Sequence, residues 1–254
     1  MKIKTYKNTI KNFNGLLFLD VANTTIFLKE MFIYEKQNEE ASIEINGKNI
    51  WLSDCIIISP LTKYSDLFAF NSKNIITKLL SSINIDYTKI LNTNYIFENI
   101  LHVINQNFDN DIISLDNSVN KIIKSLIDIS DNFITKEDVL NYLNLLQFEN
   151  ETKTIIIKDF DNLKLNELSN YIAVNNLIVL KNDIIYEMKN NFDLFEAYAL
   201  ADEQNNRIIK IDSIDGFEYF LEELFQKEIS RDSLANMSDN EVNKIKMSLK
   251  NNIF

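Results

Sequence analysis

Residues 153–183 read KTIIIKDFDNLKLNELSNYIAVNNLIVLKND, and they contain the clearest structural pattern in the chain. Two short apolar runs, Ile155–Ile157 and Leu177–Leu180, are continuous rather than alternating, as expected for strands buried on both faces. Between them, apolar residues recur at helical spacing from Leu165 to Ile172. Strand, helix and strand over about 30 residues form a βαβ unit, which predicts a parallel sheet with a right-handed crossover.

Similar apolar runs elsewhere in the chain predict further strands for the same sheet. Leu16–Val21 reads LLFLDV, and Cys55–Ser59 reads CIIIS and is followed by Pro60. Arg207–Ile211 (RIIKI) is a possible further strand. We therefore expect an α/β head built around strands near residues 16, 55, 154 and 177.

A β-hairpin is predicted over residues 41–52, because Asn46-Gly47 is the strongest two-residue turn signal and isoleucines lie on both sides of it. Residues 25–34 carry a mixed pattern of apolar and charged residues that supports no firm assignment.

Between residues 71 and 150 the apolar residues recur at helical spacing in four stripes, within 75–83, 96–104, 119–127 and 139–146. The last stripe opens with the capping box Thr135-x-x-Asp138. We therefore expect a helical lobe, a leg of residues 71–150, inserted into an α/β head of residues 1–70 and 151–212. Residues 213–254 are predicted to form a helical extension that follows Asp215-Gly216.

The apolar face of this extension must be buried, either on the chain's own head, which we favour, or on another subunit or partner. That face consists of Phe217, Phe220, Leu221, Leu224 and Phe225.

Composition limits the classes of function. The 254 residues carry a net charge of −11, whereas a nucleic-acid-binding protein is usually basic. DNA binding would therefore need lysines gathered on one surface, or carboxylates neutralised by a metal. With 3 glycines and one cysteine, a phosphate-binding loop and an internal disulfide are disfavoured. No apolar run approaches the roughly 20 residues of a membrane span, and the first residues lack a signal-peptide core, so a cytoplasmic location is expected.

Individual residues give little support for catalysis. Residues 19–25 (LDVANTT) follow the first strand where a P-loop would stand, but they contain no glycine. Asp159 ends a run that resembles a Walker-B strand, although a capping or solvated aspartate is the simpler interpretation. His102, the only histidine, lies off its helical stripe and is expected to be exposed. Cys55 is expected to be a small core residue rather than a nucleophile.

An acidic cluster lies between two of the predicted leg helices. Asp109, Asp111 and Asp116 are hard oxygen ligands on a short segment, which suits Ca²⁺. The segment is not an EF-hand, because the required glycine and the final bidentate glutamate are missing. From spacing alone, a solvated loop is the simpler alternative.

Several segments together resemble the Csn-two family, the small adaptation protein of subtype II-A CRISPR systems. The resemblance spans residues 14 to 212, and its order and spacing are carried by NGLLFLDVANTTIFLKEMFIYEKQNEE, CIIISPLTKYSDLFAFNSKNIITKLL, FDNDIISLDNSVNKIIKSL and KTIIIKDFDNLKLNELSNYIAVNNLIVL. The resemblance implies a P-loop-like α/β head without nucleotide motifs and a helical leg. It also implies a homotetrameric ring that binds Ca²⁺ and holds double-stranded DNA ends without sequence preference.

The family acts without catalysis of its own in spacer acquisition, together with the CRISPR integrase subunits and the effector nuclease. By the resemblance, Asp109, Asp111 and Asp116 fall in the acidic metal-binding stretch. Lys29, Lys78 and Lys124 fall at or near basic positions that implicate them in DNA binding. Residues 213–254 lie beyond the resemblance. Two alternatives stay open: a degenerate P-loop ATPase, and a structural adaptor that binds proteins rather than DNA.

Overall fold

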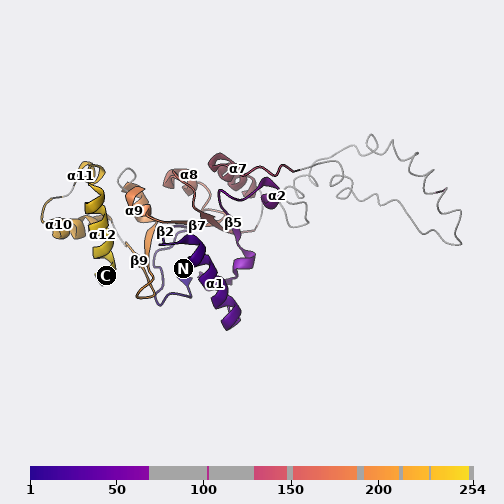
Figure 1. Ribbon diagram of the computed structural model, residues 1–254, viewed down its shortest axis with the longest axis horizontal. Coiled ribbons are helices and arrows are strands. Elements are labelled where there is room, and N and C mark those ends of the chain that lie inside the picture. The colour runs from indigo at the N-terminus through magenta and orange to yellow at the C-terminus, as the bar shows by residue number, and fades with distance from the viewer. Residues whose placement is uncertain are drawn as a thin grey trace. The chain divides into compact units, whose positions relative to one another are not determined.

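The computed structural model describes most of the head and part of the predicted leg (Figure 1). The described residues are 1–68, 102, 129–147, 151–187, 192–211, 214–228 and 230–251. Backbone contacts divide the chain into two units, one of residues 1–62 with 134–254 and one of residues 63–133. The predicted leg stripes within 75–83, 96–104 and 119–127 lie outside the described residues, apart from His102.

The first unit is an α/β structure built on a six-stranded, mostly parallel sheet. Its strand order is β5-β6-β7-β2-β8-β9, with β9 antiparallel to β8 and all other described pairs parallel. The strands are β2 (Leu16–Asp20), β5 (Ile56–Ile58), β6 (Thr154–Lys158), β7 (Asn176–Lys181), β8 (Tyr198–Asp202) and β9 (Arg207–Lys210). The four strands predicted from continuous apolar runs are present, and the fifth, near residue 207, is β9. The expectation that the run at Cys55–Ser59 is fully buried was wrong, because β5 lies at the edge of the sheet and leaves Ile57 40% exposed.

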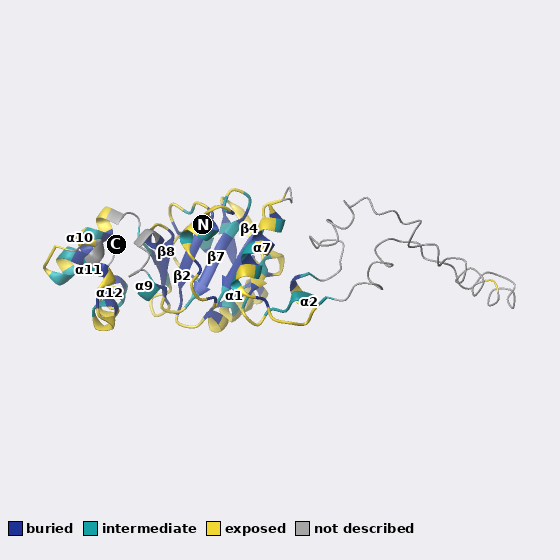
Figure 2. Cartoon of the chain, turned by 90° about the horizontal axis from the view of Figure 1, so that it is seen from above, coloured by how far each residue is buried: buried dark blue, intermediate teal, exposed yellow. Residues whose placement is uncertain are grey.

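Burial explains why the strand sequences are continuous rather than alternating. All five residues of β2 are buried, and so are Ile155–Ile157 of β6 and Leu177–Leu180 of β7. Figure 2 shows β2, β7 and β8 as a buried layer in the middle of this unit. Because both faces of the sheet are covered, apolar residues are favoured at every position along these strands.

Strand β8 was not predicted. Its sequence, YALAD, contains two alanines, which are depleted in strands and favour helices. Nevertheless, all five residues are buried, because β8 pairs with β2 in the middle of the sheet. Tertiary pairing therefore overrides local propensity at this position.

The predicted hairpin is confirmed as β3 (Ile43–Ile45) and β4 (Lys48–Ile50). Asn46 and Gly47 connect the strands with φ angles of 52° and 77°, as a type I′ turn requires. Together with β1 (Lys2–Ile3), the hairpin forms a separate three-stranded antiparallel sheet.

Helices cover both faces of the six-stranded sheet. Figure 1 shows α1 below the sheet and α7, α8 and α9 above it. The segment left unassigned from sequence lies within α1 (Thr24–Asn38), which buries Phe27 and Met31 against the sheet core. The other helices of this unit are η1 (Leu52–Asp54), α7 (Lys136–Leu146), α8 (Leu165–Ser169), α9 (Ile184–Glu187), η2 (Phe192–Glu196), α10 (Ile214–Phe225), α11 (Arg231–Ala235) and α12 (Asp239–Asn251).

The fourth predicted helical stripe is α7, and it belongs to the unit that holds the sheet. Its predicted capping box is confirmed, because Thr135 and Asp138 each accept a hydrogen bond from the other's backbone N–H. Lys136 ties the helix to the sheet unit by an ion pair of 2.8 Å with Glu167 of α8.

The second unit is described only at its base. There α2 (Tyr64–Leu67) lies beside residues 130–133, and Lys63 bridges with Phe133. Ser65 donates a hydrogen bond of 2.6 Å to Asp131. The two described segments that flank residues 69–128 therefore lie side by side.

The extension docks on the chain's own head, which is the alternative that the sequence analysis favoured. Phe217 of α10 packs on Phe195, with ring centroids 4.0 Å apart, and Phe220 and Leu221 are also buried. The expectation that Asp215-Gly216 separates the extension from the sheet was wrong, because both residues lie in the first turn of α10. In the described ranges, no helix has both the length and the hydropathy needed to cross a bilayer.

Candidate functional site at the carboxyl edge of the sheet

In open α/β sheets, ligands bind outside the carboxyl ends of the parallel strands. In this chain β2, β6 and β7 end side by side at Asp20, Lys158 and Lys181, and polar residues follow each of them. The carboxyl edge of the sheet is therefore the candidate functional site.

The turn from β2 to α1 leaves no room for a phosphate loop. Only Val21–Asn23 separate the strand from the helix, and no glycine is among them. The side-chain oxygen of Asn23 accepts a hydrogen bond of 2.9 Å from the backbone N–H of Ile26. An N–H group that could hold a phosphate at the start of α1 is thus capped by the chain itself.

Asp159, the residue that resembled a Walker-B aspartate, is held by the first residue of α1. The Thr24 hydroxyl lies 2.9 Å from each carboxylate oxygen of Asp159 and donates to them. Lys158 donates to the Thr25 hydroxyl at 2.9 Å and lies 3.4 Å from Asp159. These contacts join the end of β6 to the start of α1.

Lys181 is surrounded by two carboxylates. Its ammonium group lies 2.6 Å from Asp161 and also pairs with Glu187 of α9. Burial lowers the pKa of Lys181, but the two carboxylates outweigh burial and raise the pKa overall. The lysine therefore stays charged and is already paired within the chain.

The most buried part of the edge is completed by the C-terminal extension. Asp20 is 0% exposed, and Lys246 of α12 lies 3.0 Å from it and 2.8 Å from Asp183. The backbone N–H groups of Asp183 and Ile185 also donate to Asp20, at 3.1 and 3.3 Å. The Tyr198 hydroxyl lies 3.4 Å from the same carboxylate. One buried anion is thus neutralised by a lysine 226 residues away along the chain.

Two pKa shifts follow from this burial. Burial raises the pKa of Asp20, and Lys246 and the two backbone donors oppose that rise. Burial lowers the pKa of Lys246, but Asp20 and Asp183 outweigh burial, so that the pKa is raised. Neither Asp20 nor Lys246 was singled out from the sequence. A carboxylate at the end of a buried apolar strand is expected to have a positively charged partner. The neighbouring sequence does not indicate which lysine that partner is.

The residues predicted to carry function are only partly described. Lys29 is exposed on α1, and no described side chain forms an ion pair with it. Lys78, Lys124, Asp109, Asp111 and Asp116 lie outside the described residues. Among the residues that the structure describes, no group of three or more His, Cys, Asp or Glu could hold a metal ion.

His102 is exposed, as predicted. Cys55 lies just before β5 and is half-buried. Burial, with smaller contributions from Glu35 and Asp54, raises the pKa of its thiol to about 12. Such a thiol is protonated at neutral pH and is a poor nucleophile, in keeping with a packing role.

Comparisons of the sequence with protein-family models and with curated proteins found no match.

Proposed function

We propose that this chain is a non-catalytic protein that binds the ends of double-stranded DNA in CRISPR spacer acquisition. In this proposal it forms a Ca²⁺-stabilised homotetrameric ring in the cytoplasm and works with the CRISPR integrase subunits and the effector nuclease. The head is a P-loop-like sheet without a nucleotide site, and the leg is a helical insertion. The premise is the sequence resemblance to the Csn-two family.

The observation that supports this proposal most is the closed carboxyl edge of the sheet. Asn23 caps α1, Thr24 holds Asp159, and Lys246 neutralises Asp20. The chain's own side chains therefore occupy the hydrogen-bonding groups that a nucleotide would use in a related ATPase. This closure favours a scaffolding head over the alternative of a degenerate P-loop ATPase.

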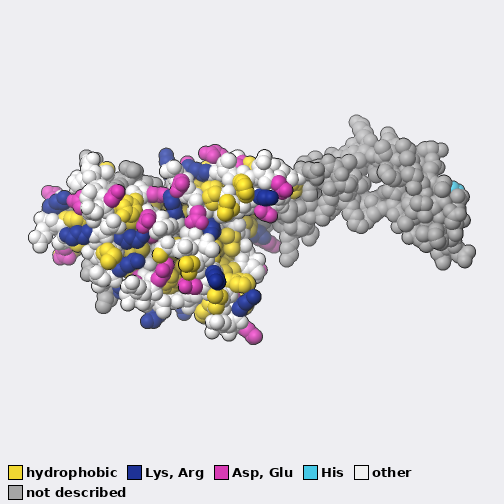
Figure 3. All heavy atoms as spheres, viewed as in Figure 1, with side chains coloured by type: hydrophobic (Ala, Val, Ile, Leu, Met, Phe, Trp, Pro, Cys, Tyr) yellow, Lys and Arg dark blue, Asp and Glu magenta, His cyan; other side chains and the backbone are white. Residues whose placement is uncertain are grey.

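DNA binding by an acidic chain needs lysines that the fold has not already neutralised. Over the described part of the face in Figure 3, lysines and arginines are interspersed with acidic side chains. Lys136, Lys158, Lys181 and Lys246 are all ion-paired within the head. Lys29 remains exposed, so a ring could bring four copies of it toward one duplex.

The proposal is tested by the salt dependence of DNA affinity for Lys29→Ala and Lys227→Ala. Lys227 is the control, because its side chain is 55% exposed in the extension that the resemblance does not cover. Each lost phosphate contact should reduce the slope of log affinity against log salt by about 0.9, so four copies would reduce it by up to about 3.6. We expect this reduction for Lys29→Ala and almost none for Lys227→Ala. Absence of duplex binding by the wild-type chain at low salt would contradict the proposal.

A further inference from the structure

The last helix, α12, is held by three buried apolar side chains, Val242, Ile245 and Leu249, and by polar contacts around one buried ion group. Lys246 is 15% exposed and reaches Asp20 and Asp183. Beside it, Tyr186 donates to Asn243 at 2.7 Å, and Arg207 donates to the backbone oxygen of Lys250. These contacts come from β2, from the turn after β7, and from α9 and β9.

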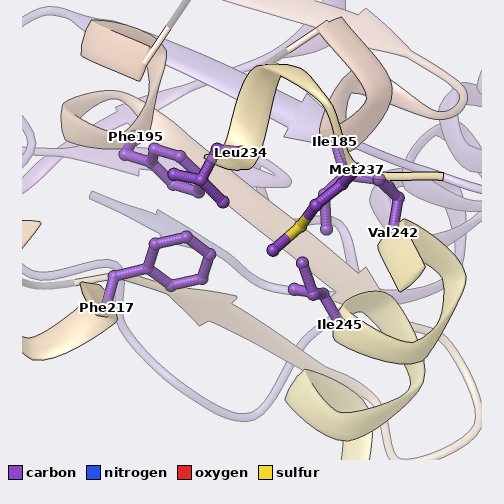
Figure 4. Close-up of a pocket in the computed structure, with 7 residues that line it drawn as sticks. All are labelled: Ile185, Phe195, Phe217, Leu234, Met237, Val242 and Ile245. Carbon is purple, nitrogen blue, oxygen red and sulfur yellow. The ribbon is translucent and has the colours of Figure 1, made fainter. Parts of the chain in front are cut away.

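The apolar part of the same interface is incompletely packed. Figure 4 shows Met237, Val242 and Ile245 of the extension facing Ile185 and Phe195 of the head around a small pocket. The pocket has a volume of about 20 Å³ and an apolar lining. A void of this kind deprives its walls of dispersion contacts, so apolar packing alone holds α12 less firmly than a filled core would.

We propose that α12 is a releasable latch on the head, and that the ion pair between Asp20 and Lys246 controls its docking. Asp20 is 0% exposed in the docked state, so withdrawal of Lys246 would leave a buried carboxylate without a cation. Breaking a buried pair by removing one partner is strongly unfavourable, because the remaining charge is uncompensated. Docking of α12 therefore depends on the charges of this pair. This inference stands independently of DNA binding.

The surroundings of Lys246 define how pH acts on the latch. Among the described residues, the titratable and charged groups that contact Lys246 or Asp20 are Asp20 on β2, Asp183 before α9 and Tyr198 on β8. Arg207 on β9 meets the same helix further along, at the backbone oxygen of Lys250. The raised pKa of Lys246 means that its stabilising contribution is present below about 10.5 and is lost as pH rises through the raised value. The raised pKa of Asp20 means that, without Lys246, protonation of Asp20 at acidic pH would relieve the uncompensated charge.

The test is hydrogen exchange of the full-length chain, comparing amides of α12 with amides of β2 and β7. Lys246→Met should speed exchange in α12 at pH 7 on the order of 100-fold, and in both wild type and variant α12 should be less protected than the sheet. Lys246→Arg keeps the positive charge, so its α12 amides should exchange at nearly the wild-type rate. Combining Lys246→Met with Asp20→Asn removes both charges and should restore most of the protection of α12. Lowering the pH should also return protection to Lys246→Met, after correction for intrinsic exchange, because a protonated Asp20 needs no cation.

Two results would overturn the latch. One is unchanged protection of α12 in Lys246→Met. The other is equal protection of α12 and the sheet, in wild type and in Lys246→Met, without rescue by Asp20→Asn, which would make α12 an ordinary part of one cooperative unit. Should Lys246→Met fail to fold, Asp183→Asn provides the milder test, because Asp183 is 49% exposed. That variant should speed exchange in α12 by about 5-fold, and no change in α12 would count against the latch.

Discussion

Glu35 joins α1 to the hairpin through one buried carboxylate. The carboxylate accepts hydrogen bonds from the backbone N–H and the hydroxyl of Ser42, at 3.0 and 2.7 Å, and from the N–H of Leu52 at 2.9 Å. We expect Glu35→Ala to lower the free energy of unfolding by about 2–4 kcal/mol, because buried donors lose their acceptor. Gln37→Ala, at an exposed position of the same helix, should change it by less than about 0.5 kcal/mol. Urea unfolding measures both variants, and equal effects would contradict the assignment.

Asp202 stabilises the folded state by an amount that depends on pH. Its side chain is 1% exposed and accepts hydrogen bonds from Asn205 at 2.8 Å and Arg207 at 2.9 Å. Burial raises the pKa of Asp202, but these bonds outweigh burial and hold the pKa below its usual value. Because the pKa is lower in the folded state, the stabilisation is present above the unfolded pKa of about 4 and is lost as pH falls through the folded pKa.

We therefore expect Asp202→Asn to lower stability at pH 7 and to weaken the loss of stability on acidification below about pH 4. Urea midpoints measured across the acid range for both proteins check this expectation. An acid dependence in Asp202→Asn as steep as that of wild type would contradict it.

At the scale of elements, the sequence predicts those helices, strands and turns whose conformation is set by neighbouring residues. Asn46-Gly47 strongly favours a two-residue hairpin turn. The continuous isoleucine run of β6 is typical of a strand buried on both faces. Strand β8 could not be predicted because its alanines have low strand propensity, and it is a strand because it pairs with β2 on one side and β9 on the other. The pairing of Asp20 with Lys246 also could not be predicted, since it depends on where α12 docks.

The C-terminal extension should stabilise the head on which it lies. Deleting residues 213–254 removes Phe217 from Phe195 and Lys246 from Asp20. A buried charge that loses its partner costs about 3–5 kcal/mol, which corresponds to a fall in Tm of roughly 10 °C in a chain of this size. We expect Asp20→Asn to restore part of this loss in the shortened chain. Thermal unfolding followed by circular dichroism tests both, and an unchanged Tm after deletion would contradict the stabilising role of the extension.

At the scale of the whole molecule, the proposed ring links calcium to assembly. Asp109 and Asp111 would repel each other unless a cation lay between them. We therefore expect Asp109→Asn with Asp111→Asn to weaken calcium binding and to shift the mass in solution from tetramer toward smaller species. Calorimetry and light scattering, each with and without calcium, measure the two effects. Unchanged calcium affinity in the double variant would exclude these carboxylates as ligands.

The proposed mode of DNA binding makes a topological prediction. Lysine contacts to phosphates supply affinity without sequence information. A closed ring that surrounds a duplex can load only over an end, so its binding should depend on the presence of an end and not on base sequence.

The most direct measurement compares one plasmid as a covalently closed circle and after linearisation, at the same salt concentration and with calcium present. We expect tight binding to the linear form and weak binding to the circle, with no dependence on which site is cut to linearise it. Equal affinity for the two forms would contradict end-loading by a ring, and absence of binding to both would contradict DNA binding itself.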